Sequence, residues 1–166
     1  MKKIVSYMMT GILLLSFLLT GCGSQEPQTG KKMSMYYINT AETKVEVHEQ
    51  YLNTKTLDEQ LDETMRYLST TPEKLEYKAP LDMGFRVLDY EVEDGKLLIN
   101  VDKAYSELSP TTEVLVRAAI VRTLTQLPNV KYVGITVEDS QLYDNAGELV
   151  GWMNADQFIN NDGNEI

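Results

Sequence analysis

The sequence predicts an α+β fold in which two helices pack on one face of a mixed sheet of three to five strands. Residues 111–127 have the apolar spacing of a helix, and Pro128 and Asn129 lead from it directly into an alternating strand at residues 132–137. A second helical pattern covers residues 57–68. The other apolar runs alternate as hairpin strands do, at residues 35–39, 45–49, 85–92 and 96–102.

The helix at residues 57–68 begins with a recognisable start signal. Thr56 is followed three residues later by Glu59, which is the spacing of a capping box. The apolar positions of this helix then fall on one face, at Leu57, Leu61, Met65 and Leu68. The acids between them are expected to face solvent.

Two features predict a hairpin and a helix start in the second half of the chain. Asp94 and Gly95 separate two alternating runs, which is a strong signal for a β-hairpin. In the second of these runs, alternation predicts a buried face formed by Leu97, Ile99 and Val101. Ser109 is placed to cap the following helix, with Pro110 at its first position.

The helix that follows Ser109 is apolar on two sides. Its first face, expected to be core, consists of Val116, Ile120, Leu124 and Leu127. A second stripe consists of Val114, Ala118 and Val121. Such a helix is either sandwiched inside its own domain or presents one face to a partner, so this stripe is a candidate interface with the sandwiched arrangement as the alternative.

The N-terminal end has the organisation of a lipoprotein signal peptide. Lys2 and Lys3 precede an apolar run of about a dozen residues, which is shorter than the roughly 20 that span a bilayer. Residues 19–22 (LTGC) resemble the bacterial lipobox. This resemblance implies cleavage before Cys22 and lipidation of its thiol, and Cys22 is the only cysteine in the chain, which excludes an intramolecular disulfide.

The predicted organisation is a signal peptide at residues 1–21, a flexible tether at 22–32, one folded domain at 33–160 and a polar tail at 161–166. The formal net charge is -10, and removal of residues 1–21 takes away two Lys and no acid. Such an acidic surface repels phosphate backbones, so nucleic acid is not an expected partner. Attachment to the membrane is expected to come from acyl chains on Cys22.

The sequence contains no recognisable catalytic or metal-binding constellation. His48 is the only histidine and has no Cys or His nearby in sequence. Asp89, Glu91 and Asp102 are acids on predicted strands, where surface alternation accounts for them. We therefore expect no catalytic residue, no metal and no cofactor, and we treat the chain as a non-enzyme.

Several of these segments resemble the GerMN domain, a domain of sporulation and spore germination proteins. Residues 121–130 (VRTLTQLPNV) are similar to the end of its helix, where the family has an aliphatic-x-T-L-x-Q-x-P-x-V pattern. Residues 95–102 with Tyr105 resemble its hairpin exit. Residues 138–142 occupy the place of its Asp-Gly turn, although Ser140 stands where Gly is expected. The resemblance covers roughly residues 37–158.

The resemblance implies a noncatalytic, extracytoplasmic domain that is related to ring-building motifs and acts by packing side by side with envelope proteins or with copies of itself. It also agrees with lipid anchoring at the outer face of the cytoplasmic membrane, since family members are often lipidated. The alternative is a module that binds cell-wall glycan through exposed aromatic side chains, for which Trp152, Tyr36 and Tyr37 are the candidates.

Overall fold

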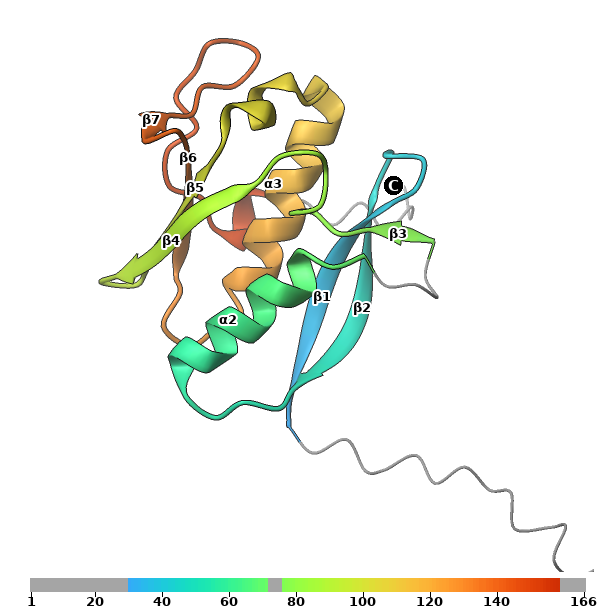
Figure 1. Cartoon of the computed structure of the whole chain (residues 1–166), viewed down its shortest axis with the longest axis vertical. Helices are drawn as coiled ribbons and strands as arrows, with labels where there is room; N and C mark the ends of the chain where they lie inside the picture. Colours follow the sequence, from blue (N-terminus) through green and yellow to red (C-terminus); the bar gives the residue numbers. More distant parts are fainter. Residues whose placement is uncertain (1–29, 72–75, 159–166) are drawn as a thin grey trace, which may run out of the picture.

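The computed structural model describes residues 30–71 and 76–158, and it confirms the α+β class. Within these residues there are two α-helices and two sheets (Figure 1). The elements are β1 (Lys31–Asn39), β2 (Val45–Leu52), α2 (Leu57–Leu68), β3 (Tyr77–Lys78), β4 (Val87–Glu93), β5 (Lys96–Val101), the 3₁₀ helix η2 (Lys103–Glu107), α3 (Pro110–Leu124), β6 (Tyr132–Val137), β7 (Ser140–Gln141) and the 3₁₀ helix η3 (Ala155–Gln157).

The strands form two sheets, which corrects the expectation of a single mixed sheet. β1 lies between β2 and β3 in an antiparallel sheet of three strands. The other sheet has the order β4-β5-β6-β7 and is mixed, because β5 and β6 are parallel. The parallel pair needs a crossover, and α3 supplies it. The two sheets stay separate because α3 lies between β1 and β6 and contacts both (Figure 1).

The central position of α3 explains why it is apolar on two sides. Val116, Ile120 and Leu124 are fully buried, as the first face predicts. In the second stripe, however, Val121 is 0% exposed and Ala118 is 8% exposed, while Val114 is 45% exposed. The stripe is therefore not a free surface, because two of its three side chains are enclosed between the sheets, and the sandwiched alternative describes it.

The predicted helix starts are present. The Thr56 side chain accepts a hydrogen bond from the Glu59 backbone N–H, and the Glu59 carboxylate accepts one from the Thr56 N–H, which completes the capping box of α2. At α3, the Ser109 hydroxyl accepts from the Thr112 N–H, and Pro110 occupies the first turn. Both starts depend only on local sequence, which is why they could be predicted.

The hairpin turns of the four-stranded sheet use residues with positive φ. Asp94 (φ 51°) and Gly95 (φ 79°) join β4 to β5, as the Asp-Gly signal predicts. Between β6 and β7, Glu138 (φ 48°) and Asp139 (φ 63°) take the two central positions without any glycine. The Asn100 side chain accepts a hydrogen bond from the Asp139 N–H at 3.0 Å, so a neighbouring strand supports this strained turn.

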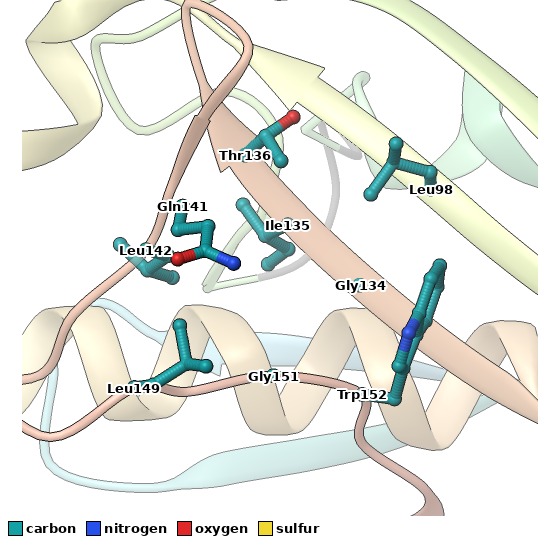
Figure 2. Close-up of a pocket in the computed structure, with 9 residues that line it drawn as sticks. All are labelled: Leu98, Gly134, Ile135, Thr136, Gln141, Leu142, Leu149, Gly151 and Trp152. Carbon is teal, nitrogen blue, oxygen red and sulfur yellow. The ribbon is translucent and has the colours of Figure 1, made fainter.

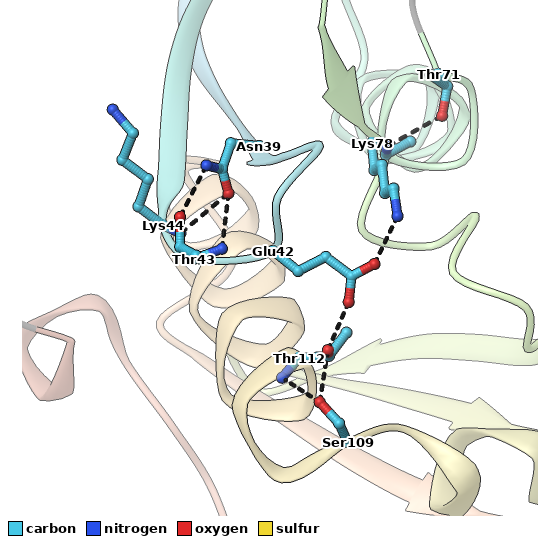
Figure 3. A network of polar contacts seen from close by, with 9 residues as sticks. Asn39, Glu42, Thr43, Lys44, Thr71, Lys78, Ser109 and Thr112 are labelled. Carbon is cyan, nitrogen blue, oxygen red and sulfur yellow. Dashed lines mark hydrogen bonds and ion pairs between the residues drawn. The ribbon is translucent and has the colours of Figure 1, made fainter.

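The turn between β1 and β2 is tied to α3 by Glu42 (Figure 3). The Thr112 hydroxyl, in the first turn of α3, donates to the Glu42 carboxylate at 2.6 Å, and the Lys78 ammonium contacts the same carboxylate. These two hydrogen bonds, from Lys78 and then from Thr112, lower the pKa of Glu42. Asn39 closes the turn itself by accepting from the Thr43 and Lys44 N–H groups. One acid thus joins the three-stranded sheet to the helix.

Side chains of α3 and the turn after it cover the part of β1 that β3 does not reach. The Gln126 amide accepts from the Ser34 N–H at 3.0 Å and donates to the Ser34 carbonyl at 2.7 Å. The Thr123 hydroxyl accepts from the Tyr36 N–H at 3.0 Å. Since β3 pairs only at the end of β1, these side chains take the place of a neighbouring strand. We refer to this contact as the sealed edge of β1.

Some predicted segments lie outside the described residues, namely the signal peptide at residues 1–21 with Cys22, most of the tether, and the tail at 161–166. The tether prediction also extended to residue 32, whereas β1 begins at Lys31. Among the residues that the model describes, no helix is long and apolar enough to cross a membrane.

Candidate functional site

The outer face of the four-stranded sheet is the surface that α3 does not cover. Leu97, Ile99 and Val133 point toward α3 and are fully buried. The alternate positions point outward, and strand pairing places Leu98 beside Gly134. The segment after β7 then returns along β6, where Met153 pairs with Val133, so its neighbour in sequence, Trp152, lies on the outer face. An apolar row therefore runs across the middle of this face.

A groove is hollowed between this row and the returning segment, with a volume of about 230 Å³ (Figure 2). Trp152 stands at one end and Leu149 lies toward the other (Figure 2). Nine residues line the groove, and most are apolar or glycine: Leu98, Gly134, Ile135, Thr136, Gln141, Leu142, Leu149, Gly151 and Trp152. We call this feature the outer groove.

Trp152 can lie close to β6 because Gly134, on that strand, has no side chain. A Cβ atom added at Gly134 would lie 2.8 Å from the Trp152 ring, so only glycine lets the indole approach the strand this closely. The Lys96 ammonium lies 5.4 Å from the centre of the indole, within the range of a cation–π interaction. Trp152 remains 43% exposed and Leu149 remains 52% exposed. Two large apolar side chains therefore border the groove without being covered.

A polar cluster lies beside the groove at Asn100. Its buried side-chain amide donates to the Asp139 carboxylate at 2.8 Å and to the Asp89 carboxylate at 3.1 Å. Its amide oxygen accepts from the Asp139 N–H and from the Thr136 hydroxyl. All the hydrogen-bonding capacity of Asn100 is thus used to hold β4, β6 and the turn at Asp139 together, which is a structural task.

Acidic residues surround the outer groove. They come from β4, from the turn between β6 and β7, and from the loop before Leu149: Asp89, Glu91, Glu93, Glu138, Asp139, Asp144 and Glu148. All of them are exposed except Asp144, which is half-buried. Pairing places Glu91 directly opposite Leu98. The groove is therefore an apolar surface in a strongly negative setting, with Lys96 as a cation at its Trp152 end.

Glu63 is a buried acid away from the groove. It is 7% exposed, and its carboxylate accepts hydrogen bonds from the Thr54 hydroxyl at 2.7 Å and from the Asn53 and Thr54 N–H groups. Burial by itself raises the pKa of Glu63, but the hydrogen bonds to the charged form outweigh it, and the net pKa is lowered. Glu63 therefore holds the loop between β2 and α2 in place and has no free oxygen for chemistry.

Tyr105, Glu113 and Arg117 form a second buried cluster. The Tyr105 hydroxyl donates to Glu113 at 3.0 Å, and the Arg117 guanidinium approaches the same carboxylate at 2.6 Å. Burial, and then the charge of Glu113, raise the pKa of Tyr105 well above its usual value. A tyrosine with a raised pKa stays protonated, and this cluster therefore joins η2 to α3 as a structural network.

The residues singled out by sequence fall in different places. Cys22 is outside the described residues. Val114, Ala118 and Val121 do not form one surface, because only Val114 is exposed. His48 is half-buried on β2 opposite Met35, and Tyr37 is 2% exposed. Within the described residues, no group of three or more His, Cys, Asp or Glu side chains is placed to hold a metal ion.

Of the three aromatic candidates, Trp152 borders the outer groove. Tyr36 is half-buried and stacks under Arg122, whose guanidinium carbon lies 4.1 Å from the ring centre. Sequence reasoning did not identify Gly134, Gly151 and Leu98 as groove residues. An isolated glycine inside a β-branched strand was an available signal at Gly134, because such a glycine indicates a close approach by another part of the molecule.

Comparison with models of protein families identifies the family to which the chain belongs. The model of the Germane family, described as "Sporulation and spore germination", matches residues 34–143. This match covers well over half of the 166 residues, and the chain therefore belongs to this family. The resemblance seen in the sequence to the GerMN domain is confirmed.

Solved structures agree on the fold. The tandem GerMN domains of the sporulation protein GerM from Bacillus subtilis match with a TM-score of 0.54 and 18% identity, over 81% of this chain and 49% of that chain. The chain thus spans about half the length of the tandem structure. The first GerMN domain of the same protein matches with a TM-score of 0.55 and 14% identity, over 73% of this chain and 94% of that one.

A candidate lipoprotein from Clostridium perfringens also matches, with a TM-score of 0.51 and 17% identity, over 76% of this chain and 89% of that chain. At these identities the similarity shows a shared fold. No curated protein matches the chain.

Proposed function

We propose that this protein is a noncatalytic lipoprotein at the outer face of the cytoplasmic membrane, which acts by protein–protein assembly in sporulation or spore germination. The biological setting rests on membership of the Germane family. The mode of action rests on one structural observation. The outer groove is an apolar surface that the described domain leaves uncovered, while the buried acids Glu63 and Glu113, away from the groove, serve the fold.

The same observation argues against an active site. Hydrolytic chemistry needs a nucleophile beside a base, or two carboxylates at a defined separation with free oxygens. Glu63 and Glu113 are saturated by partners from their own domain. None of the nine residues that line the outer groove is an acid, and such a lining is better suited to burying side chains of another protein than to transforming a substrate.

Assembly into a ring of copies remains part of this proposal. It no longer depends on Ala118 and Val121, which are enclosed by the two sheets. Val114 is the exposed member of that stripe and stays a candidate contact, as do the outer edges of β2 and β4, which pair with no further described strand.

The membrane anchor can be tested at Cys22, which we propose as the lipidated residue. We expect Cys22→Ala to accumulate as an uncut precursor or to appear in the medium, because acyl chains hold a protein to the membrane only while they are attached. Fractionation with immunoblotting measures this, and Ser24→Ala is the matched control. Normal processing and membrane retention of Cys22→Ala would contradict the proposal.

Assembly can be tested on the full chain in its own membranes. Chemical crosslinking followed by detergent extraction and mass spectrometry should place the protein in a complex larger than the monomer. The Leu124→Ala variant, which weakens the core, is the control for unfolding artefacts. A protein that stays monomeric under crosslinking throughout sporulation and germination would rule assembly out.

Glycan binding is the second candidate function, and exposed Trp152 favours it. An indole that is 43% exposed beside a groove can stack on a sugar ring. Co-sedimentation of the full chain with purified cell-wall sacculi tests this directly. Binding that is lost in Trp152→Ala and retained in Val47→Ala would favour the glycan function over assembly.

A further inference from the structure

We propose that the outer groove binds a segment of another protein that presents an apolar side chain flanked by Lys or Arg residues. This inference rests on the proposed function of protein–protein assembly and deepens it, because it states the chemistry of the partner. Three properties of the groove carry it: its size, its lining and the charge around it.

The size of the groove suits one side chain. Its volume is about 230 Å³, while pockets for small-molecule ligands usually have about 300–1,000 Å³. An oligosaccharide chain would extend well beyond it. Gly134 and Gly151 leave space because neither has a side chain, and Gly151 (φ 59°) lies in the left-handed region that glycine adopts most readily.

The lining favours an apolar guest. Among the nine lining residues, Thr136 and Gln141 are the two with a hydroxyl or amide side chain. A sugar loses many hydrogen bonds to water when it is buried and needs polar partners in return, which this lining supplies sparsely. Trp152 and Leu149, by contrast, are large apolar side chains that are half-exposed and would lose contact with water when covered.

The surrounding charge selects a basic partner. Seven acids lie around the groove, and Lys96 is engaged with the Trp152 ring. Opposite charges on the two sides of an interface steer the encounter and exclude like-charged partners. The guest side chain is therefore expected to be flanked by Lys or Arg, which can reach Glu91 on one side of the groove and Glu148 on the other.

A second copy of this chain fits the groove poorly. The chain has a formal net charge of -10. Several of its own cations are already paired with its own acids: Lys32 with Glu49, Lys44 with Glu46, Lys78 with Glu42 and Arg86 with Asp102. Two such surfaces would repel each other at the groove, so the partner is a different and more basic protein.

The lone tryptophan provides a direct readout. Trp152 is the only Trp in the chain, so its fluorescence emission reports on the groove alone. The full chain is titrated with three blocked pentapeptides: leucine between two pairs of lysines, serine between two pairs of lysines, and leucine between two pairs of glutamates. We expect the lysine–leucine peptide to shift the emission to shorter wavelength and to bind at least about tenfold more tightly than either other peptide.

Variants test the two halves of the inference separately. Leu149→Ala should weaken the lysine–leucine peptide by about tenfold, while Val47→Ala, an equally exposed apolar residue of the other sheet, should not. Glu91→Lys should weaken it as well, while Glu107→Lys, an exposed acid on η2, should not. Equal binding of the leucine and serine peptides, or equal effects of Leu149→Ala and Val47→Ala, would overturn the inference.

A second measurement separates the groove from assembly in general. A photo-crosslinking amino acid is placed at position 149, and separately at positions 47 and 114, in the full lipoprotein in its own membranes. We expect position 149 to capture a protein segment in which Lys or Arg flank an apolar residue. Capture of glycan or of a second copy at position 149 would overturn the inference. Protein crosslinks at position 47 or 114 with none at 149 would overturn it while leaving assembly standing, and no protein crosslink at any position would count against assembly itself.

Discussion

The two sheets of this domain differ in which of their surfaces other parts of the chain cover. In the three-stranded sheet, the free part of β1 is sealed by Gln126 and Thr123, which bond the backbone of Ser34 and Tyr36 as a strand would. In the four-stranded sheet, the outer face is left uncovered, with Trp152 and Leu149 exposed around a groove. The same domain thus hydrogen-bonds the backbone groups of a strand edge in one place and leaves apolar side chains exposed in another.

The difference separates residues that serve the fold from residues that are free to serve a partner. A buried backbone group without a hydrogen bond costs stability, so the edge of β1 next to α3 had to be sealed. An exposed sheet face carries no such requirement, because its backbone is paired within the sheet and its side chains can face water. The polar residues of the helix end are consequently structural, and the apolar residues of the outer groove are available for binding.

The largest effect is expected from a charge placed at Val121. This side chain is 0% exposed between the two sheets, so the carboxylate of Val121→Glu would be buried without a partner. We expect the cooperative thermal transition to be lost. Val114→Glu, seven residues earlier on the same helix and 45% exposed, is the matched control and should melt within about 0.5 kcal/mol of the parent. A normal melt for Val121→Glu would show that α3 is not sandwiched.

The next largest effect is expected from Leu124→Ala. Leu124 is 0% exposed, and truncation at such a position costs about 2–5 kcal/mol in the free energy of unfolding. Thr125→Ala should cost about 1 kcal/mol at most, because Thr125 is half-buried and loses a hydrogen bond to the Val121 carbonyl. Urea denaturation of both variants measures the difference, and equal midpoints would contradict the packing of α3.

The sealed edge of β1 should respond to Gln126→Ala. This change removes both partners of the Ser34 backbone, and we expect a loss of about 1–3 kcal/mol. Hydrogen exchange at the Ser34 amide should also become faster. Gln141→Ala is the control in the other sheet, where the side chain is exposed at the groove, and should cost less than about 0.5 kcal/mol. Equal losses for the two variants would mean that the edge is not sealed as described.

The smallest of these effects, complete at neutral pH and lost in acid, is expected from Glu63→Gln. The folded-state pKa of Glu63 is lowered from the usual value of 4.5, so its stabilising effect is complete above pH 4.5 and is lost as the pH falls through the folded-state pKa. Glu63→Gln should therefore reduce the fall in Tm between pH 5 and pH 3 relative to the parent. Parallel Tm curves for the two proteins would show that Glu63 does not contribute to acid unfolding.

Local features of the fold could be predicted well. The capping box of Thr56 and Glu59, the Ser109–Pro110 start of α3 and the Asp94–Gly95 turn each depend on residues within four positions of one another, so sequence contains the whole interaction. The family resemblance could also be recognised from residues 121–130. In the structure, Thr123 and Gln126 of that segment form hydrogen bonds with the backbone of β1.

The features that sequence did not reveal depend on contacts between distant parts of the chain. Ala118 and Val121 could be core or interface as long as the number of sheets was unknown, and only the position of α3 between β1 and β6 decided it. The Glu138–Asp139 turn needs no glycine because Asn100, on another strand, holds it.

By itself, the sequence determined the α+β class, the helix starts, the hairpin turn at Gly95 and the family, because each is encoded in short-range pattern and chemistry. Only the tertiary structure decided that there are two sheets, that α3 is enclosed, and that Leu98, Gly134 and Trp152 meet at one groove. Those three residues come from β5, β6 and the segment after β7, and their proximity follows from strand order and packing, which no local pattern specifies.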